Sequence, residues 1–257
     1  AVTEITAPHP SGLTLPAIIL DADGADEWCE LQGCDNPFAL TAAEIGKRVA
    51  AAGVVGLGGA AFPSAVKLTG AARAKVTTLA MNGGECEPYL SCDDRLMRDQ
   101  AAGIVDGIRI MLHATGAQLA LVGIEDNKPE AIAAMQAAAA GVDTIQVRPV
   151  PARYPMGSEK QLIQVLTGRE VPADSLAFDI GVVVHNVGTA LAVRAAIREG
   201  KPLISRLVTV NGRCVSQPVN IEVCIGTPAE EVIAFAGGLK GEGIGLARRI
   251  MGGPMMG

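Results

Sequence analysis

The amino-acid sequence predicts an α/β fold, in which helices cover the faces of a mostly parallel sheet. Short β-prone runs alternate with helix-forming stretches through the middle of the chain. Parallel neighbours need a long crossover between them, so this alternation favours a parallel sheet. Two β-prone runs and one helix follow near the end, which predicts a small α+β module. Pro and Gly interrupt β-prone runs over residues 1–30, which indicates a β-rich element there.

The individual elements are predicted in chain order. Thr41 and Glu44 form a capping box that opens a helix ending at Gly53. The β-prone runs of the main sheet cover 76–81, 118–124, 143–150 and 179–184. The intervening helices cover 94–114 and 128–141, the second capped by Asn127, and others begin after Ser158 and after Asn186. The tail holds β-prone runs at 206–215 and 219–226 and a helix over 228–236.

Composition excludes several classes of protein. The chain has 257 residues, 49% of them hydrophobic and 19% charged, which is typical of a folded, water-soluble protein. A net charge of -6 argues against nucleic acid as the main partner, and no apolar run is long enough for a membrane span. The chain has no initiator Met and ends on "GLARRIMGGPMMG". We therefore interpret it as a trimmed part of a longer protein.

The cysteines do not form a recognisable metal motif. They stand at positions 29, 34, 86, 92, 214 and 224, and no two have the Cys-x-x-Cys spacing of zinc ribbons or ferredoxin clusters. We expect free thiols and no metal site. Three histidines, with no nucleophile–base ordering, leave little room for general-base catalysis, so no catalytic side chain is predicted.

The stretch "GLGGAAFPSAVKL" (56–68) is a glycine-rich loop. Gly56, Gly58 and Ala61 match the letters of a dinucleotide-binding fingerprint, but a helix precedes the loop where that fingerprint needs a strand. Two interpretations stay open. The loop is a tight turn between packed helices, or its bare main chain offers N–H groups to a flat or phosphorylated ligand. In the second case Lys67 adds a positive charge.

The stretch "NGGECEP" (82–88) directly follows the strand predicted at 76–81. Open α/β sheets bind ligands at the carboxyl ends of their strands, so we expect a ligand here. Its carboxylates lack the spacing of a calcium loop. Asp93 and Asp94 are interpreted as caps of the following helix. Glu85 and Glu87 are interpreted as acceptors for ribose hydroxyls or ring N–H groups.

Two further clusters stand at strand–helix junctions. "YPMGSEKQ" (154–161) places an aromatic side chain and a glycine before a helix start. "VVVHNVGTA" (182–190) ends a strand and opens a helix. We interpret His185 as a hydrogen-bonded junction histidine rather than a catalyst.

Five motifs together resemble a known family. "GLGGAAFPSAVKL", "NGGECEPYLSCDDRLM", "YPMGSEKQLI", "LTGREVP" and "HNVGTA" resemble, in order and over essentially the whole chain, the C-subunit of the Rnf ion-translocating electron transport complex. The first three resemble, more distantly, the flavin-bearing subunit of respiratory complex I. The resemblance implies FMN held non-covalently on a Rossmann-like sheet beside an NAD(H) site. It also implies a β-grasp module and [4Fe–4S] clusters, whose cysteines are absent here and belong to the full-length protein only.

The resemblance also implies a division of the chain. Residues 1–35 would be the remnant of a β-rich barrel-like domain, and 36–202 the FMN- and NADH-binding domain. Residues 203–240 would be the β-grasp-like module, and 241–257 a truncated linker toward an iron–sulfur domain.

The implied cofactor-binding residues fall in the four loops. The resemblance places some along the flavin and its phosphate, some near the nicotinamide nucleotide, and some closing the site: Gly56, Gly58, Gly59, Phe62, Lys67, Asn82, Glu85, Cys86, Glu87, Tyr154, Gly157, Ser158, Glu159, His185 and Asn186. Phe62 and Glu87 are expected on the NADH side. Gly84 and Ser158 stand where the complex I subunit has acids, which changes how NADH is held.

The function implied by the resemblance is an electron-input module. Hydride would pass between nicotinamide and flavin, and single electrons would pass on to the clusters. The expected partners are the other subunits of the membrane complex and a ferredoxin-like carrier, at the cytoplasmic face of the bacterial inner membrane. The alternatives are a cobalamin reductase of the propanediol-utilisation type and a cofactor-free docking subunit.

Overall fold

A computed structural model describes residues 2–8, 13–240 and 249–255. The chain divides into two compact units, Ala1–Leu31 and Gln32–Gly257. The first unit contains β1 (Val2–Pro8) and β2 (Thr14–Leu20), which pair antiparallel. Residues 1–35 therefore include β structure, as expected. That this segment is the remnant of a barrel-like domain stays a prediction.

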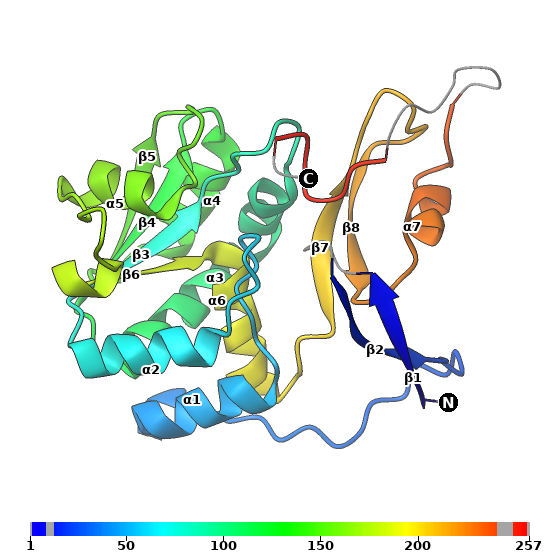
Figure 1. Ribbon diagram of the computed structural model, residues 1–257. Helices are drawn as coiled ribbons and strands as arrows, with labels where there is room; N and C mark the ends of the chain where they lie inside the picture. The colour runs from blue at the N-terminus through cyan, green and yellow to red at the C-terminus, as the bar shows by residue number, and fades with distance from the viewer. Residues whose placement is uncertain (1, 9–12, 241–248, 256–257) are drawn as a thin grey trace. The chain divides into compact units, whose positions relative to one another are not determined.

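The second unit is built on a four-stranded parallel sheet (Figure 1). Its strands, in the order β5-β4-β3-β6, are β5 (Ile145–Val150), β4 (Leu119–Glu125), β3 (Thr78–Gly83) and β6 (Val182–Asn186). The predicted α/β class with a parallel sheet is confirmed. The chain moves from β3 outward to β5 and then crosses to β6 on the other side of β3. The strand order thus reverses between β3 and β6, where sheets of this kind bind ligands.

Helices cover both faces of the sheet. One face carries α2 (Ser64–Ala74), α3 (Cys92–Thr115), α4 (Pro129–Ala138) and α6 (Val187–Arg194), and α1 (Ala42–Ala51) packs on α2 and α3. The other carries α5 (Glu159–Thr167). Side chains of β6 alternate accordingly, because Val183 enters the larger core while Val182 and Val184 pack with α5. Gly107 lets α3 approach α6 closely, since a Cβ there would overlap the Ala190 carbonyl.

Most predicted elements are present, with shifted ends. The Thr41–Glu44 capping box is confirmed. The predicted cap Asn127 is wrong: Lys128 precedes α4 without a side-chain cap, and Pro129 begins the helix with a pre-set φ. The strand expected from 179 begins at Val182 because Ala177–Ile180 forms a 3-10 turn that Gly181 ends with a φ of 71°.

The tail of the second unit is α+β. It contains β7 (Ser205–Val210) and β8 (Val219–Cys224), which pair antiparallel, and α7 (Ala229–Phe235). Of the predicted linker 241–257, the structure describes 249–255. In the described part of the chain, no helix combines the length and apolar character that crossing a membrane requires.

Candidate functional site

The site lies where the strand order reverses, at the carboxyl ends of β3 and β6. Asn82 of β3 and Asn186 of β6 are partners in the parallel register. The glycine loop before α2 and the 154–158 loop before α5 reach the same place, through hydrogen bonds to Thr189 and Asn82. The tertiary structure therefore gathers four loops that are far apart in sequence.

The glycine loop is closed on itself and tied to α6. Gly56 N–H donates to the Phe62 carbonyl at 2.8 Å. Leu57 N–H donates to the Thr189 hydroxyl at 2.9 Å. Gly59 has a φ of +116°, which favours glycine. A Cβ at Gly58 would lie 3.4 Å from the Asn186 Cβ, so the bare loop passes directly over the start of α6.

Lys67 and His185 lie at the α2 side of the site. Lys67 Nζ donates to Glu159 at 3.0 Å and to the Val184 carbonyl at 3.1 Å. His185 is buried, and its Nε2 has no hydrogen-bond partner among the described residues. Burial, then the charge of Lys67, lowers the pKa of His185 to about 3, so the ring is neutral. Our interpretation of His185 as a hydrogen-bonded junction histidine is therefore wrong for Nε2. The buried Ser64 Oγ is also without a partner in the described part.

Asn82 holds two loops together. Its Nδ2 donates to the Gly157 carbonyl at 2.8 Å, and its Oδ1 accepts from Gly84 N–H at 2.9 Å. Gly157 N–H in turn donates to Cys86 Sγ at 2.9 Å. Burial raises the pKa of the Cys86 thiol, which therefore stays protonated at neutral pH. A Cβ at Gly157 would overlap that sulfur, so this position needs glycine.

Glu85 caps α3. Its two carboxylate oxygens accept from Asp93 N–H at 2.8 Å and Asp94 N–H at 3.3 Å, and Lys128 Nζ lies 3.3 Å away. The interpretation of Asp93 and Asp94 as the caps is thus corrected, because the preceding loop supplies the acceptor. The backbone N–H of Glu85 donates to Glu125 at 3.2 Å. The described contacts give Glu85 a structural role, and flavin contact by it stays a prediction.

Asp93 faces inward rather than toward solvent. Its Oδ2 accepts from Asn186 Nδ2 at 2.6 Å. Asn186 Oδ1 accepts from Gly188 N–H and Thr189 N–H, so the predicted start of α6 after Asn186 is confirmed. Burial, then the charge of Glu85, raises the pKa of Asp93 to about 7. No pattern in the sequence indicates that this aspartate is half-buried and turned toward Asn186.

Glu87 is half-buried, and its carboxylate lies against residues 253–255. Its Oε2 accepts from Met255 N–H at 2.8 Å, and its Oε1 has no hydrogen-bond partner among the described residues. Phe62 and Tyr154 are large, exposed aromatic side chains. Ser158 precedes α5 but makes no side-chain capping bond. These residues offer surface to a ligand.

Contacts bring together the glycine loop, Lys67, Asn82, Cys86, Gly157, Glu159 and Asn186. The side chains of Phe62, Tyr154 and Ser158 are exposed instead. The carboxylate of Glu85 is used by α3, and that of Glu87 contacts the segment near Met255. Sequence reasoning missed the contacts that Thr189 makes with Leu57, Asp93 with Asn186, and Arg206 of β7 with the Leu57 carbonyl, which span 93 to 149 residues of chain. For Thr189 a signal existed, since it follows the Asn186 cap by three positions.

The residues fit a flavin nucleotide better than a metal. The bare glycine loop would leave room for a flat ring system, and Lys67, His185 Nε2 and Ser64 Oγ are polar groups of the kind that a phosphorylated chain would need. In the described part of the chain, no group of three metal-ligating side chains is assembled.

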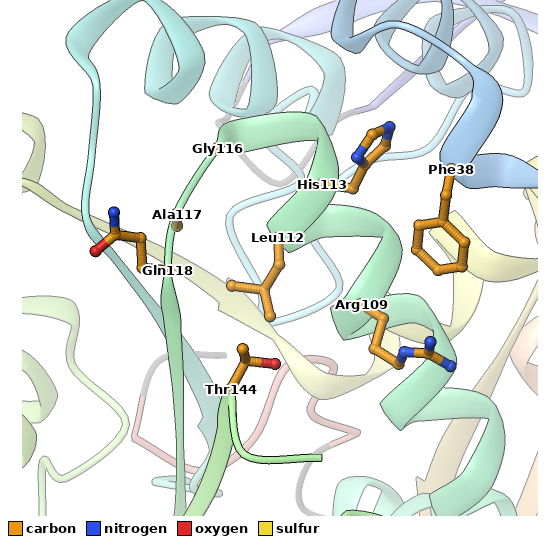
Figure 2. A pocket seen from close by; sticks show the side chains of 8 residues that line it. All are labelled: Phe38, Arg109, Leu112, His113, Gly116, Ala117, Gln118 and Thr144. Carbon is orange, nitrogen blue, oxygen red and sulfur yellow. The ribbon is translucent and has the colours of Figure 1, made fainter.

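A separate pocket of about 320 Å³ lies at the opposite edge of the sheet (Figure 2). Gln118 and Thr144, which line it, immediately precede β4 and β5, at the amino ends of the strands. Arg109 and His113 of α3 and Phe38 line it as well. This pocket shares no residue with the loops described above.

Comparisons with known proteins agree with this geometry. Residues 49–195 match the family described as the Nuo51 FMN-binding domain, and residues 207–257 match the SLBB domain. The C-subunit of the ion-translocating oxidoreductase complex of Rhodobacter capsulatus is 51% identical over 258 residues, covering 100% of this chain and 49% of that protein. The protein of the same name from Pseudomonas aeruginosa is 50% identical, covering 97% of this chain and 32% of that protein. The chain thus spans about half or less of the curated relatives it matches.

Solved structures of an NAD+-reducing [NiFe]-hydrogenase share this fold. The crystal structure of an NAD+-reducing [NiFe]-hydrogenase in the H2-reduced state matches with a TM-score of 0.65 and 26% identity, covering 79% of this chain and 40% of that one. The air-oxidised state gives a TM-score of 0.67. With the parallel sheet, the glycine loop over α6 and the relatives in agreement, the resemblance to the Rnf C-subunit is confirmed, and the chain belongs to the Nuo51 FMN-binding domain family.

Proposed function

We propose that this chain binds FMN at the reversal of strand order and serves as the NAD(H)-linked electron-transfer module of a larger oxidoreductase. The observation that carries the proposal is the convergence of the glycine loop, Lys67 and the buried His185 at the ends of β3 and β6, where Nε2 lacks a partner among the described residues. An unpartnered buried polar atom is costly, so a bound group that supplies a partner is favoured.

In this proposal each loop has its own task. Gly56, Gly58 and Gly59 present main chain to the ring system, and Lys67 neutralises the phosphate. Asn82 holds the 154–158 loop against the β3 loop. When bound, FMN supplies the exchange of a hydride with nicotinamide and of single electrons with clusters. The side chains orient the ring and exclude water, and none of them needs to act as acid or base.

The nicotinamide nucleotide would enter on the side of Phe62 and Glu87. Phe62 and Tyr154 are exposed, and the buried Glu87 Oε1 has no hydrogen-bond partner among the described residues, so a ribose hydroxyl would supply one. Gly84 and Ser158 leave this side with fewer carboxylates than the complex I subunit, so Glu87 has a larger share in binding the ribose.

For the longer protein we propose the role that its relatives' name describes. The chain would contribute electron input to an ion-translocating Rnf complex at the cytoplasmic face of the bacterial inner membrane. Its partners would be the other subunits and a ferredoxin-like carrier, and [4Fe–4S] clusters would be bound outside this chain.

Titration of the purified chain with FMN tests the proposal. We expect one FMN per chain, with quenched flavin fluorescence, and reduction of bound FMN by NADH under anaerobic conditions. Lys67→Gln should weaken FMN binding, while Lys75→Gln, at the exposed far end of the same helix, should not. Absence of FMN binding by the wild-type chain would contradict the proposal. So would equal binding by both variants.

A further inference from the structure

The C-terminal strand pair contacts the glycine loop through the side chain of Arg206. Arg206 of β7 donates from Nη2 to the Leu57 carbonyl of the glycine loop at 3.3 Å, and from Nε to the Leu207 carbonyl at 3.4 Å. It lies between the two matched regions, 49–195 and 207–257. Neither family match covers it.

The same strand pair binds the loop after Glu87. Ser91 N–H donates to the Thr209 hydroxyl at 3.1 Å, and Asn220 Nδ2 donates to Ser91 Oγ at 3.0 Å. Asn211 Nδ2 donates to the Tyr89 carbonyl at 3.2 Å. The pair β7–β8 is therefore joined to the β3–α3 loop by several hydrogen bonds, which hold its strands in one place relative to that loop.

The environment of Asp93 shows what the Arg206 charge does. Burial, then Glu85, raises the pKa of the Asp93 carboxyl, while the Asn186 hydrogen bond, Arg206 and Lys128 lower it. The groups that act on this carboxyl, by charge or by hydrogen bond, are Glu85 of the β3–α3 loop, Cys92 of α3, Lys128 before α4, Asn186 of β6 and Arg206 of β7. Arg206 and Lys128 are the cations of this set, and Lys128 also contacts Glu85 at 3.3 Å.

Asp93 is in turn joined to the glycine loop. It accepts from Asn186 Nδ2 at 2.6 Å, and the Asn186 Cβ lies beside Gly58. Arg206 thus contacts the loop directly at Leu57, and its charge acts on the carboxyl that binds Asn186.

We propose that Arg206 is a positioning residue of the flavin site, supplied by the C-terminal strand pair. It fixes the glycine loop through the Leu57 carbonyl and offsets the negative charge of Asp93 beneath it. The proposal rests on the proposed FMN site. In this proposal the strand pair β7–β8 supplies one residue of the flavin site, in addition to any role in linking the chain to further domains.

Three variants test this in the purified chain: Arg206→Gln, Arg206→Lys and, as a matched control in the β7–β8 connection, the exposed Arg213→Gln. FMN affinity is measured by fluorescence titration, and the titration of Asp93 by carboxyl NMR of the protein without FMN, assigned with Asp93→Asn. We expect Arg206→Gln to weaken FMN binding by about tenfold, the effect of one charge-assisted hydrogen bond. It should also shift the Asp93 midpoint upward. Arg206→Lys should return that midpoint toward wild type, because it restores the charge.

The remaining outcomes are distinct. If Arg206→Gln binds FMN as tightly as Arg213→Gln, the proposal is overturned. If affinity falls but the Asp93 midpoint does not move, Arg206 acts through the Leu57 hydrogen bond alone, and the electrostatic role is overturned. If the wild-type chain binds no FMN, the proposed function fails, and this proposal fails with it. Thermal unfolding of each variant identifies a loss of affinity that comes from misfolding.

Discussion

At the scale of single residues, Gly58 and Asn186 lie so close that only a small side chain fits at position 58. A Cβ added at Gly58 would meet the Asn186 Cβ at 3.4 Å, which is ordinary contact. A methyl group therefore fits, whereas a branched side chain presses on the residue that caps α6. Substitutions at Gly58 can therefore distinguish a cofactor-binding loop from a turn that only packs two helices.

We expect Gly58→Val to abolish FMN binding at concentrations where Gly58→Ala still binds. The branched side chain occupies the surface that a flavin ring would cover, while the loop's closing bond between Gly56 and Phe62 remains. Fluorescence titration measures the affinity, and circular dichroism verifies the fold. Unchanged affinity in the valine variant would favour the packing turn.

Glu87→Gln should weaken binding of NAD+ to the FMN-loaded protein by roughly ten- to a hundredfold, the loss of one charged hydrogen bond. FMN affinity, measured on the same variant, serves as the internal control and should stay near wild type. Release of FMN would instead assign Glu87 to the flavin. If neither ligand responds, the carboxylate serves only the contact with Met255 N–H.

At the scale of elements, the amino end of α3 determines the shape of the site. Ser91 precedes the helix without a side-chain cap, and Glu85 performs that task from the loop. The loop therefore has to fold back over its own helix. This geometry places Gly84 and Cys86 at the end of β3, beside Gly157.

Glu85→Ala should lower the free energy of unfolding by about 1–3 kcal/mol, because two amide donors and Lys128 lose their acceptor. Glu87→Ala, two positions along the same loop, should cost less, since one of its oxygens has no partner among the described residues. Urea unfolding of both variants measures the difference. A more stable Glu85→Ala would show that repulsion between Glu85 and Asp93 outweighs the cap.

At the scale of the whole molecule, the half-buried Asp93 links stability to pH. Its pKa is about 7 in the folded chain, against an ordinary value of 3.8. Between these values the folded state holds a proton that the unfolded state has lost. The stability that protonated Asp93 contributes is therefore fully present below pH 3.8. It is lost as the pH rises through about 7.

Asp93→Asn should remove this dependence. The amide keeps an acceptor for Asn186 but carries no charge, so wild type and variant should have similar stability at about pH 4, near the ordinary pKa of an aspartate. At about pH 8 the variant should be more stable by on the order of a few kcal/mol. Urea unfolding at both pH values measures the effect. Equal stability of the two proteins at the higher pH would show that ionising Asp93 in the folded chain costs no free energy of unfolding.

The sequence by itself determined the fold class and the place of the site. Alternating β and helical runs predicted the parallel sheet, because element type follows from local patterns and parallel neighbours need crossovers. The Asn186 cap and the Thr41–Glu44 box depend on neighbours within three positions, so they were also predictable. The motifs that resemble the Rnf C-subunit indicated which loops meet.

Only the tertiary structure decided how the polar groups of the site are used. Glu85 became the cap of α3, Asp93 turned inward to Asn186, and His185 Nε2 has no partner in the described part of the chain. Arg206 reached the glycine loop from a strand whose pattern carries no such signal. The physical reason is that these roles depend on burial and on partners far away along the chain. A buried carboxylate and a solvated one have the same letter in the sequence, and only packing separates them.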